Sequence, residues 1–555
     1  MKLNKILTYV LLLLPAFALQ SCLKDQEDIF DSSASARVEK YLSDTQKVLQ
    51  SSQYGWALEN FPDRNQSYGG YTYTLKFQGD TVITHSEQDH NNAVVSLYSM
   101  KNVDGPVLSF DTHNKQLHDF ATPNSDSNVG KGGDFEFVID SVGDDLIKVH
   151  GNRNQNTMYL RKLTEPADNY IAKVEQTATN FGLLAATGTL AGQNVQIVFD
   201  RDNRQAIISD GTNEVQAGYC VTTSGIRFYK PVTLGGTTVS ELTYSDNDLS
   251  LTGNNSQLAG IYDPSIITNA IGSIGSDDNA FTRTLNNLPH LDQFNITTSA
   301  SWLTATVSGS SIQLAASANT TGDLRSAKVI VTSKLAPQVK SSFTVTQMNL
   351  TDIIGNYKFY YIDYDKKKVT ATAEIAQSGS ALKLVVKTKL LGGDFTLTFP
   401  AEFDQATGSL ALQAGATLYN QKLKLTTSSG KEIQGYMISA FEFGDGYVTY
   451  KNVVSALMPF SHDDQNGTYA QMGNLKVQQS VLDYQVESLD IYFAAVQNPT
   501  SEDEVYGMVD QWKNCTLIKT TAASPAKPAF LLPVSTKAAA SQPRFKSLAG
   551  YKIKK

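Results

Sequence analysis

The chain has 555 residues, with 54 acidic and 46 basic side chains and a formal net charge of −8 at pH 7. An acidic chain repels the phosphate backbone of nucleic acid, so we expect no nucleic-acid partner. A length prior of about 150 residues per domain indicates three or four domains.

The first residues predict export from the cytoplasm. Lys2 and Lys5 precede an apolar run over residues 6–19. This run is shorter than the roughly 20 residues that span a bilayer as a helix. A basic start, an apolar run and small residues before the cut are typical of a secretory signal peptide, here residues 1–21.

Leu19-Gln20-Ser21-Cys22 resembles the lipobox of bacterial lipoproteins. In that family the signal is cut before the cysteine, and the cysteine carries the lipid. The resemblance therefore implies lipidation of Cys22, with the acyl chains as an outer-membrane anchor. The acidic residues 23–28 are similar to the export signal of Bacteroidota lipoproteins, which implies a place on the cell exterior. We expect residues 22–31 to be a tether; a chance cysteine after an ordinary signal peptide is the alternative.

Residues 32–262 are predicted to form one domain, an N-terminal helix followed by β-structure. Asp31, Ser32 and Ser33 are good N-cap types, and apolar residues then recur at helical spacing, which predicts one amphipathic helix over about 34–49. Tyr71, Tyr73, Leu75 and Phe77 alternate with polar residues, which predicts a strand with one buried side. Further short strands at hairpin spacing favour antiparallel barrels or sandwiches.

The same region resembles an uncharacterised lipoprotein family, domain of unknown function 4302. The matching features are the tether, Gly55-Trp56, residues 69–73 and Lys76-Phe77. The resemblance covers residues 22–262 and implies no activity and no catalytic residues.

Residues 263–276 are rich in Gly and Ser and have little periodicity, so they are predicted to be a linker. The next block, residues 277–349, is similar to a BACON domain through Trp302-Leu303, Asn319-Thr320, Arg325 before a strand and a closing Val-Thr-Gln347. The resemblance implies an immunoglobulin-like β-sandwich with carbohydrate or mucin binding. Trp302 is either a sugar-stacking platform or, more simply, a core residue.

Residues 350–520 are predicted to form a β-barrel-like domain, and residues 521–555 a flexible tail whose end can return to a sheet edge. An aromatic cluster opens this block. Tyr357, Phe359 and Tyr361 share one strand face, which leaves another face for candidate ligand-binding residues. We predict that Tyr360 and Tyr364 line a groove there, that Asp363 bonds ligand hydroxyls, and that Trp512 is exposed; an edge of ordinary tyrosines is the alternative.

The sequence carries few signs of chemistry. His85 and His90, with two carboxylates between them, have zinc-ligand types, but a solvated loop is the preferred interpretation. Cys220 and Cys515 are expected to be free and buried. We expect no metal, no cofactor and no catalysis, because the nucleophile elbow, the zinc-protease motif and the phosphate loop are all missing. Paired carboxylates that meet only in space stay open.

The resulting prediction is a mostly β, multidomain chain in which antiparallel barrel or sandwich domains flank a small immunoglobulin-like sandwich, with one N-terminal helix. The preferred function is a lipid-anchored, outer-membrane surface protein that binds glycan or mucin without catalysis. The alternatives are an adhesive protein that contacts other proteins, a barrel that carries an apolar ligand, and, last, a glycan-cleaving enzyme.

Overall fold

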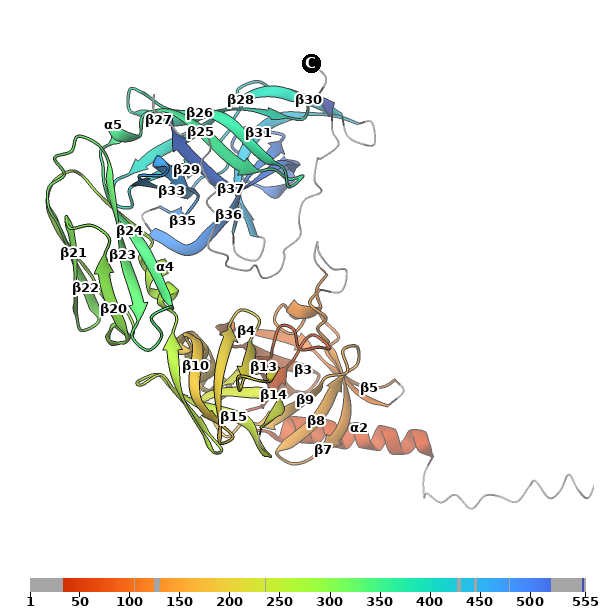
Figure 1. The fold of residues 1–555 in the computed structure, drawn as a ribbon. Coiled ribbons are helices and arrows are strands. Elements are labelled where there is room, and N and C mark those ends of the chain that lie inside the picture. The colour runs from red at the N-terminus through yellow and green to blue at the C-terminus, as the bar shows by residue number, and fades with distance from the viewer. Residues whose placement is uncertain are drawn as a thin grey trace, which may run out of the picture. The chain divides into compact units, whose positions relative to one another are not determined.

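A computed structural model describes residues 33–103, 105–123, 130–234, 236–426, 431–443, 447–478, 480–520 and 552–553. The predicted signal peptide, the tether with Cys22 and most of the tail lie outside the described residues. The chain is mostly β, as predicted (Figure 1). No helix in the described part is long and apolar enough to cross a membrane.

The described residues fall into two compact units. Unit 1 lies within Met1–Arg64, Tyr71–Phe120 and Gly132–Glu175, and unit 2 lies within Asn65–Gly70, Ala121–Lys131 and Gln176–Lys555. The boundary between the two units falls inside the region 32–262 that was predicted as one domain.

Unit 1 is built on one antiparallel sheet of nine strands in the order β4-β3-β2-β1-β9-β8-β7-β6-β5. β4 and β5 end the sheet on opposite sides, yet only Tyr98 separates them in the chain, so the sheet must curve back on itself. The strands are β1 (Trp56–Asn60), β2 (Tyr71–Gln78), β3 (Thr81–Ser86), β4 (Asp89–Leu97), β5 (Ser99–Asn102), β6 (Pro106–Ser109), β7 (Glu136–Val142), β8 (Leu146–Gly151) and β9 (Thr157–Lys162).

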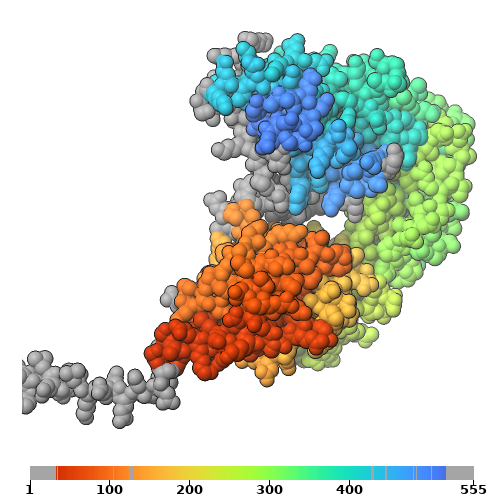
Figure 2. Space-filling model, turned by 180° about the vertical axis from the view of Figure 1, so that it is seen from behind, coloured from red at the N-terminus to blue at the C-terminus, as the bar shows by residue number. Residues whose placement is uncertain are grey.

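The predicted first helix is confirmed as α2 (Ala34–Ser51). The Ser33 hydroxyl accepts a hydrogen bond from Ala36 N at 3.2 Å and caps its start. Leu49, 1% exposed, turns toward the core, where its carbonyl accepts the Trp56 indole N–H at 2.8 Å. The opposite side of α2 is solvated, and Figure 2 shows the helix, in red, on the surface of unit 1.

β2 alternates as predicted, with Tyr71, Tyr73, Leu75 and Phe77 in the core. Its second face is not left to solvent, however, because Thr72 and Thr74 are each 1% exposed. The expectation of a single buried side is therefore wrong. The second face of the sheet is covered because a helix that was not predicted from the sequence, α3 (Ala167–Asn180), begins over it.

Unit 2 begins with a closed, eight-stranded antiparallel barrel. Its interior is filled with side chains; Phe181 and Phe199, for example, pack edge to face at 5.1 Å. The free Cys220 is buried here, as expected. The strands are β10 (Leu183–Leu190), β11 (Gln193–Asp200), β12 (Gln205–Ser209), β13 (Glu214–Thr222), β14 (Gly225–Leu234), β15 (Thr237–Ser245), β16 (Ser250–Gly253) and β17 (Ser256–Tyr262).

The predicted linker over residues 263–276 is wrong, because it contains helix α4 (Pro264–Ile271) and strand β18 (Ser273–Ser276). The Asp263 carboxylate accepts Ser265 N at 2.9 Å, and proline occupies the first helical position, so the start of the helix is fixed locally. β18 pairs parallel with β24 and so belongs to the next domain.

The middle domain is the predicted two-sheet sandwich. One sheet has the order β18-β24-β23-β20 and the other β19-β22-β21. Val329, Val345, Ile312 and Leu314, from both sheets, are 0% exposed and form the core between them. The strands are β19 (Phe281–Leu285), β20 (Phe294–Thr298), β21 (Leu303–Ser308), β22 (Ser311–Ala316), β23 (Arg325–Ser333) and β24 (Lys340–Gln347).

The C-terminal domain follows the short helix α5 (Leu350–Ile353). Eight strands pair in a continuous ring, β25-β26-β27-β28-β29-β33-β34-β37, which confirms the barrel-like prediction. These strands are β25 (Gly355–Ile362), β26 (Lys368–Ser378), β27 (Ala381–Leu390), β28 (Gly393–Asp404), β29 (Ser409–Gln413), β33 (Val454–Asp463), β34 (Gly467–Gln471) and β37 (Val505–Lys519).

The remaining strands extend the sheet away from the ring. β31 and β36 pair with each other, and β36 also pairs with β37. β38 pairs with β30, which confirms that the end of the tail returns to a sheet edge. These strands are β30 (Leu423–Thr426), β31 (Glu432–Phe443), β32 (Tyr447–Thr449), β35 (Asn474–Val477), β36 (Ser480–Ala494) and β38 (Lys552–Ile553).

Candidate functional site

The aromatic cluster on β25 is divided between two faces of the strand, as predicted. Tyr357, Phe359 and Tyr361 are at most 1% exposed. Tyr360 lies on the other face and is partly exposed, and Tyr364 lies beyond the strand at 45% exposure.

Asp363 serves the turn between β25 and β26 rather than a ligand. Its carboxylate accepts Lys367 N at 2.8 Å, and its backbone N–H donates to Lys367 O at 3.0 Å. The carboxyl predicted to bond ligand hydroxyls is therefore already bonded within the hairpin.

The prediction that Trp512 is exposed is wrong: its exposure is 0%. Its polar neighbours Gln511 and Lys513 lie on the opposite face of β37, so Trp512 itself alternates into the core. There it stacks on Tyr361 at 4.4 Å, and its indole N–H donates to Asp510 Oδ2 at 2.8 Å. A side chain held in this way is part of the barrel core and offers no surface to a ligand.

Trp302 is not the buried core residue that was preferred. It is partly exposed, and the Arg325 guanidinium lies over its ring, 4.4 Å from the centroid. Arg325 is fixed in turn by Gln347 Oε1, which accepts Nε at 2.8 Å and Nη2 at 2.6 Å. Trp302 is thus partly exposed at the surface of the sandwich, with Arg325 over one face of its ring.

The two histidines considered as zinc ligands separate. His85 lies on β3, and His90, at the start of β4, pairs with Glu175 of α3. Glu87, between them, is 3% exposed, and its carboxylate accepts Thr72 N at 3.1 Å. Within the described part of the chain, no group of three or more His, Cys, Asp or Glu residues could hold a metal.

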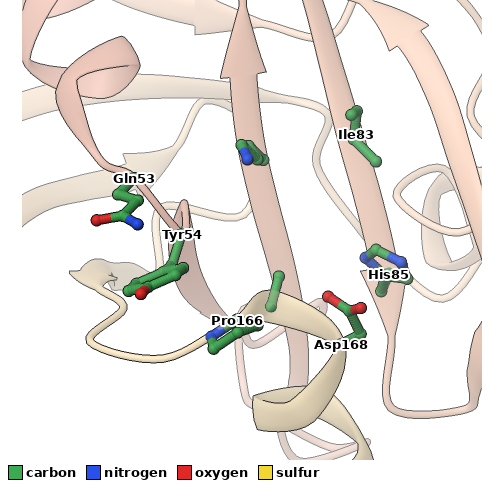
Figure 3. Close-up of a pocket in the computed structure, with 8 residues that line it drawn as sticks. Gln53, Tyr54, Ile83, His85, Pro166 and Asp168 are labelled. Carbon is green, nitrogen blue, oxygen red and sulfur yellow. The ribbon is translucent and has the colours of Figure 1, made fainter.

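A pocket of about 360 Å³ that was not predicted from the sequence lies in unit 1, on the second face of the sheet. Figure 3 shows labelled side chains from three parts of the chain around it. The α2–β1 loop, strands β2 and β3, and the start of α3 supply the lining residues, which are Gln53, Tyr54, Lys76, Ile83, His85, Pro166, Ala167 and Asp168.

Local features fix each wall of the pocket. The Ser52 hydroxyl donates to Gly55 O at 2.7 Å and accepts Gly55 N at 3.0 Å, which closes the loop that carries Tyr54. Gly55 has φ +90°, and a Cβ there would lie 2.6 Å from Leu75 O, so only glycine fits.

The strand register places the floor of the pocket. Thr74 pairs with His85, and Lys76 pairs with Ile83, so all four side chains lie on one face of β2 and β3. The first turn of α3 covers this face, since Ala167 packs with Ala57 of β1. Lys76 was visible in the sequence as a polar position on β2. The proximity of Asp168 to Lys76 could not be predicted, because it depends on the position of α3.

The polar side chains of the pocket are available to a ligand. Among the described residues, Gln53, Tyr54, Lys76 and Asp168 make no hydrogen bond or ion pair with their side chains. His85 uses only Nδ1, which lies 3.4 Å from Thr74 Oγ1, so Nε2 remains. In Figure 3 the Asp168 carboxylate points toward His85. Donors and acceptors therefore converge beside the ring of Tyr54.

Comparisons with known proteins give two domain matches. Residues 26–246 match the model of a domain of unknown function, DUF4302, and residues 293–348 match the BACON model, described as an N-terminal candidate binding domain. The search of curated proteins found no match. The pocket lies within the first match, and Trp302 and Arg325 lie within the second. The two matches thus agree with the two resemblances found in the sequence, DUF4302 in the N-terminal region and BACON in the middle region.

Proposed function

We propose that this protein is a lipid-anchored surface protein that binds glycan, and that the pocket of unit 1 holds one sugar residue of that glycan. The observation that carries the proposal is the convergence of three polar side chains, unpaired among the described residues, beside the ring of Tyr54 in one pocket. About 360 Å³ is at the low end of the roughly 300–1,000 Å³ typical of ligand sites, which suits a single ring.

The chemistry of the lining favours a hydroxylated ring over other ligands. A sugar needs donors and acceptors at its edge and an apolar surface against its C–H face; Lys76, Gln53 and Asp168 supply the former, and Tyr54 supplies the latter. A phosphate would meet the Asp168 carboxylate opposite a single lysine. A purely apolar ligand would leave the partly buried Lys76 without a hydrogen-bond partner.

Two further observations support a glycan ligand at the cell surface. The BACON match places a candidate binding domain in the same chain, and Trp302 keeps part of its ring exposed there. Cys22 follows an apolar segment in the lipobox pattern, so an acylated N-terminus would hold both domains at the membrane surface.

The proposal is tested by binding of the chain begun after Cys22 to a panel of glycans and to mucin. We expect Tyr54→Ala and Asp168→Asn each to weaken binding about tenfold or more, because each removes a direct contact. Tyr364→Ala is the matched control, since it removes an exposed tyrosine outside the pocket. Thermal unfolding of each variant checks that the fold is intact.

Each outcome has a definite meaning. Loss of binding in the pocket variants alone supports the assignment. Binding that is unchanged in these variants but lost in Trp302→Ala places the glycan on the BACON domain and refutes the pocket. Binding to protein partners, with none to any glycan, refutes the function as a whole.

A further inference from the structure

The C-terminal domain buries two carboxylates that share one serine hydroxyl. Asp490 and Ser488 lie on β36, and Glu442 lies on β31; all three are at most 2% exposed. Ser488 Oγ lies 2.7 Å from Asp490 Oδ1 and 2.9 Å from Glu442 Oε2. Both distances are those of hydrogen bonds.

The two hydrogen bonds of Ser488 Oγ need two protons, and the site cannot supply both if the two carboxylates are ionised. A serine hydroxyl has one proton and can donate it to one oxygen only. An ionised carboxylate is an acceptor and has no proton to give. Both contacts are therefore hydrogen bonds only if one of the two carboxyl groups is protonated and donates to Ser488 Oγ.

The surrounding groups decide which carboxyl carries the proton. Glu442 Oε2 also accepts Gln511 Nε2 at 2.5 Å and lies 3.8 Å from the Lys513 ammonium, both on β37. These contacts stabilise a negative charge on Glu442. Asp490 Oδ2, by contrast, has no hydrogen-bond partner among the described residues. The proton therefore belongs to Asp490.

The environment of Asp490 favours its neutral form. Ala440 pairs with it on β31, and the same face of the sheet continues into an apolar cluster that includes Tyr492 and Val505. Burial is the largest influence and raises the pKa of Asp490 to about 8. The charge of Glu442 acts in the same direction, whereas Ser488, Lys513 and Gln511 act against it without cancelling the rise. The other titratable groups nearby, Asp510 and Cys515, also have raised pKa values, chiefly because they are buried.

We propose that Asp490 is a protonated carboxylic acid in the folded protein at neutral pH and that its proton links β36 to β31 through Ser488. Loss of this proton as the pH rises makes the C-terminal domain less stable. The ordinary pKa of an aspartate is 3.8. Between about pH 4 and pH 8 the folded domain holds a proton that the unfolded chain has released. The stabilisation is complete below this window and is lost across it as the pH increases.

Infrared spectroscopy of the whole soluble chain tests the protonation state directly. At pH 7 we expect the C=O stretch of a protonated carboxylic acid, which shifts when the aspartates are labelled with ¹³C and is missing in Asp490→Asn. Because the pKa of Asp510 is also raised, Asp510→Asn is measured beside it and should keep the band. Loss of the band in Asp510→Asn would assign the proton to Asp510 and overturn the proposal, even if Asp490→Asn fails to fold. Absence of the band at pH 7, or its persistence in folded Asp490→Asn, overturns the proposal.

Thermal unfolding at pH 5 and pH 9 tests the consequence. An asparagine side chain cannot ionise, so Asp490→Asn should gain stability relative to the wild-type protein as the pH rises. The measured quantity is the change in the Tm difference between the two proteins, which removes any cost of the substitution itself. Asp464→Asn, at an exposed aspartate, is the matched control and should show no such change. A Tm difference that stays constant with pH refutes the proposed link.

Discussion

Trp512 shows how strongly one side chain can bind the C-terminal barrel together. Its ring packs against Phe359, Tyr361 and Phe399, so it joins β37 to β25 and β28. Aromatic contacts of this kind add to the free energy gained by burying the ring. The side chain that looked most available to a ligand is therefore a central part of the core.

Trp512→Ala should lower the free energy of unfolding by about 3–5 kcal/mol, because it empties a large and well-packed site. Denaturant unfolding measures the loss. Tyr364→Ala, at 45% exposure, is the comparison and should stay within about 0.5 kcal/mol of the wild-type protein. Equal effects of the two substitutions would contradict the buried position of Trp512.

A second residue-scale prediction concerns the stability of the fold at low pH. Burial alone would raise the pKa of Asp404, but the hydrogen bond and charge of Lys476 and the hydrogen bonds from Thr407 together outweigh it, and the net pKa is lowered. A carboxyl with a lowered pKa stabilises the fold above its ordinary value of 3.8, and this stabilisation is lost as the pH falls below that value. Asp404→Asn should therefore reduce the loss of Tm between pH 5 and pH 3. An undiminished loss would show that this ion pair does not contribute.

At the scale of elements, α4 shows how a cap can make a helix from a segment that reads as a linker. Asp263 caps the helix through Ser265 N and also pairs with Arg201 Nη2 at 2.5 Å. The segment 263–276 is rich in glycine and serine and has no long apolar stripe, so its periodicity gave no sign of a helix. The cap and the following proline were the local signals.

Asp263→Ala should cost about 1 kcal/mol or more, because it removes the cap together with the ion pair. Asp263→Asn keeps a good capping residue and removes only the charge, so it should cost less. Chemical denaturation of the two variants separates these contributions. If the asparagine variant is as costly as the alanine variant, the ion pair rather than the cap holds this element.

The limits of prediction from sequence also lie at this scale. Strand alternation identified β2 and its buried residues, because the period of two belongs to the strand itself. α3 was missed although Ile171 and Val174 are both fully buried. The pocket depends on where α3 begins over the sheet. The sequence alone therefore could not show that Lys76 on β2 and Asp168, about ninety positions later, line the same pocket. The convergence is a property of tertiary packing.

At the scale of the whole molecule, the predicted class and the two family resemblances were confirmed, since both depend on patterns that extend over many residues. The proposed location, by contrast, rests on one residue, Cys22, which lies outside the described residues. We expect cells that express the protein to incorporate a palmitate analogue into it, and Cys22→Ala to abolish the label and the membrane association. Label retained in that variant would contradict the proposed anchor.

The short strand β38 covers one edge of β30. Lys552 and Ile553 occupy the hydrogen-bonding groups on one side of β30. If proteolysis removed them, the backbone amides and carbonyls on this side of β30 would be unpaired at an exposed sheet edge. A strand from another molecule can add to such an edge. We therefore expect a protease cut before Lys552 to expose this side of β30 and to increase self-association of the protein, measured by light scattering.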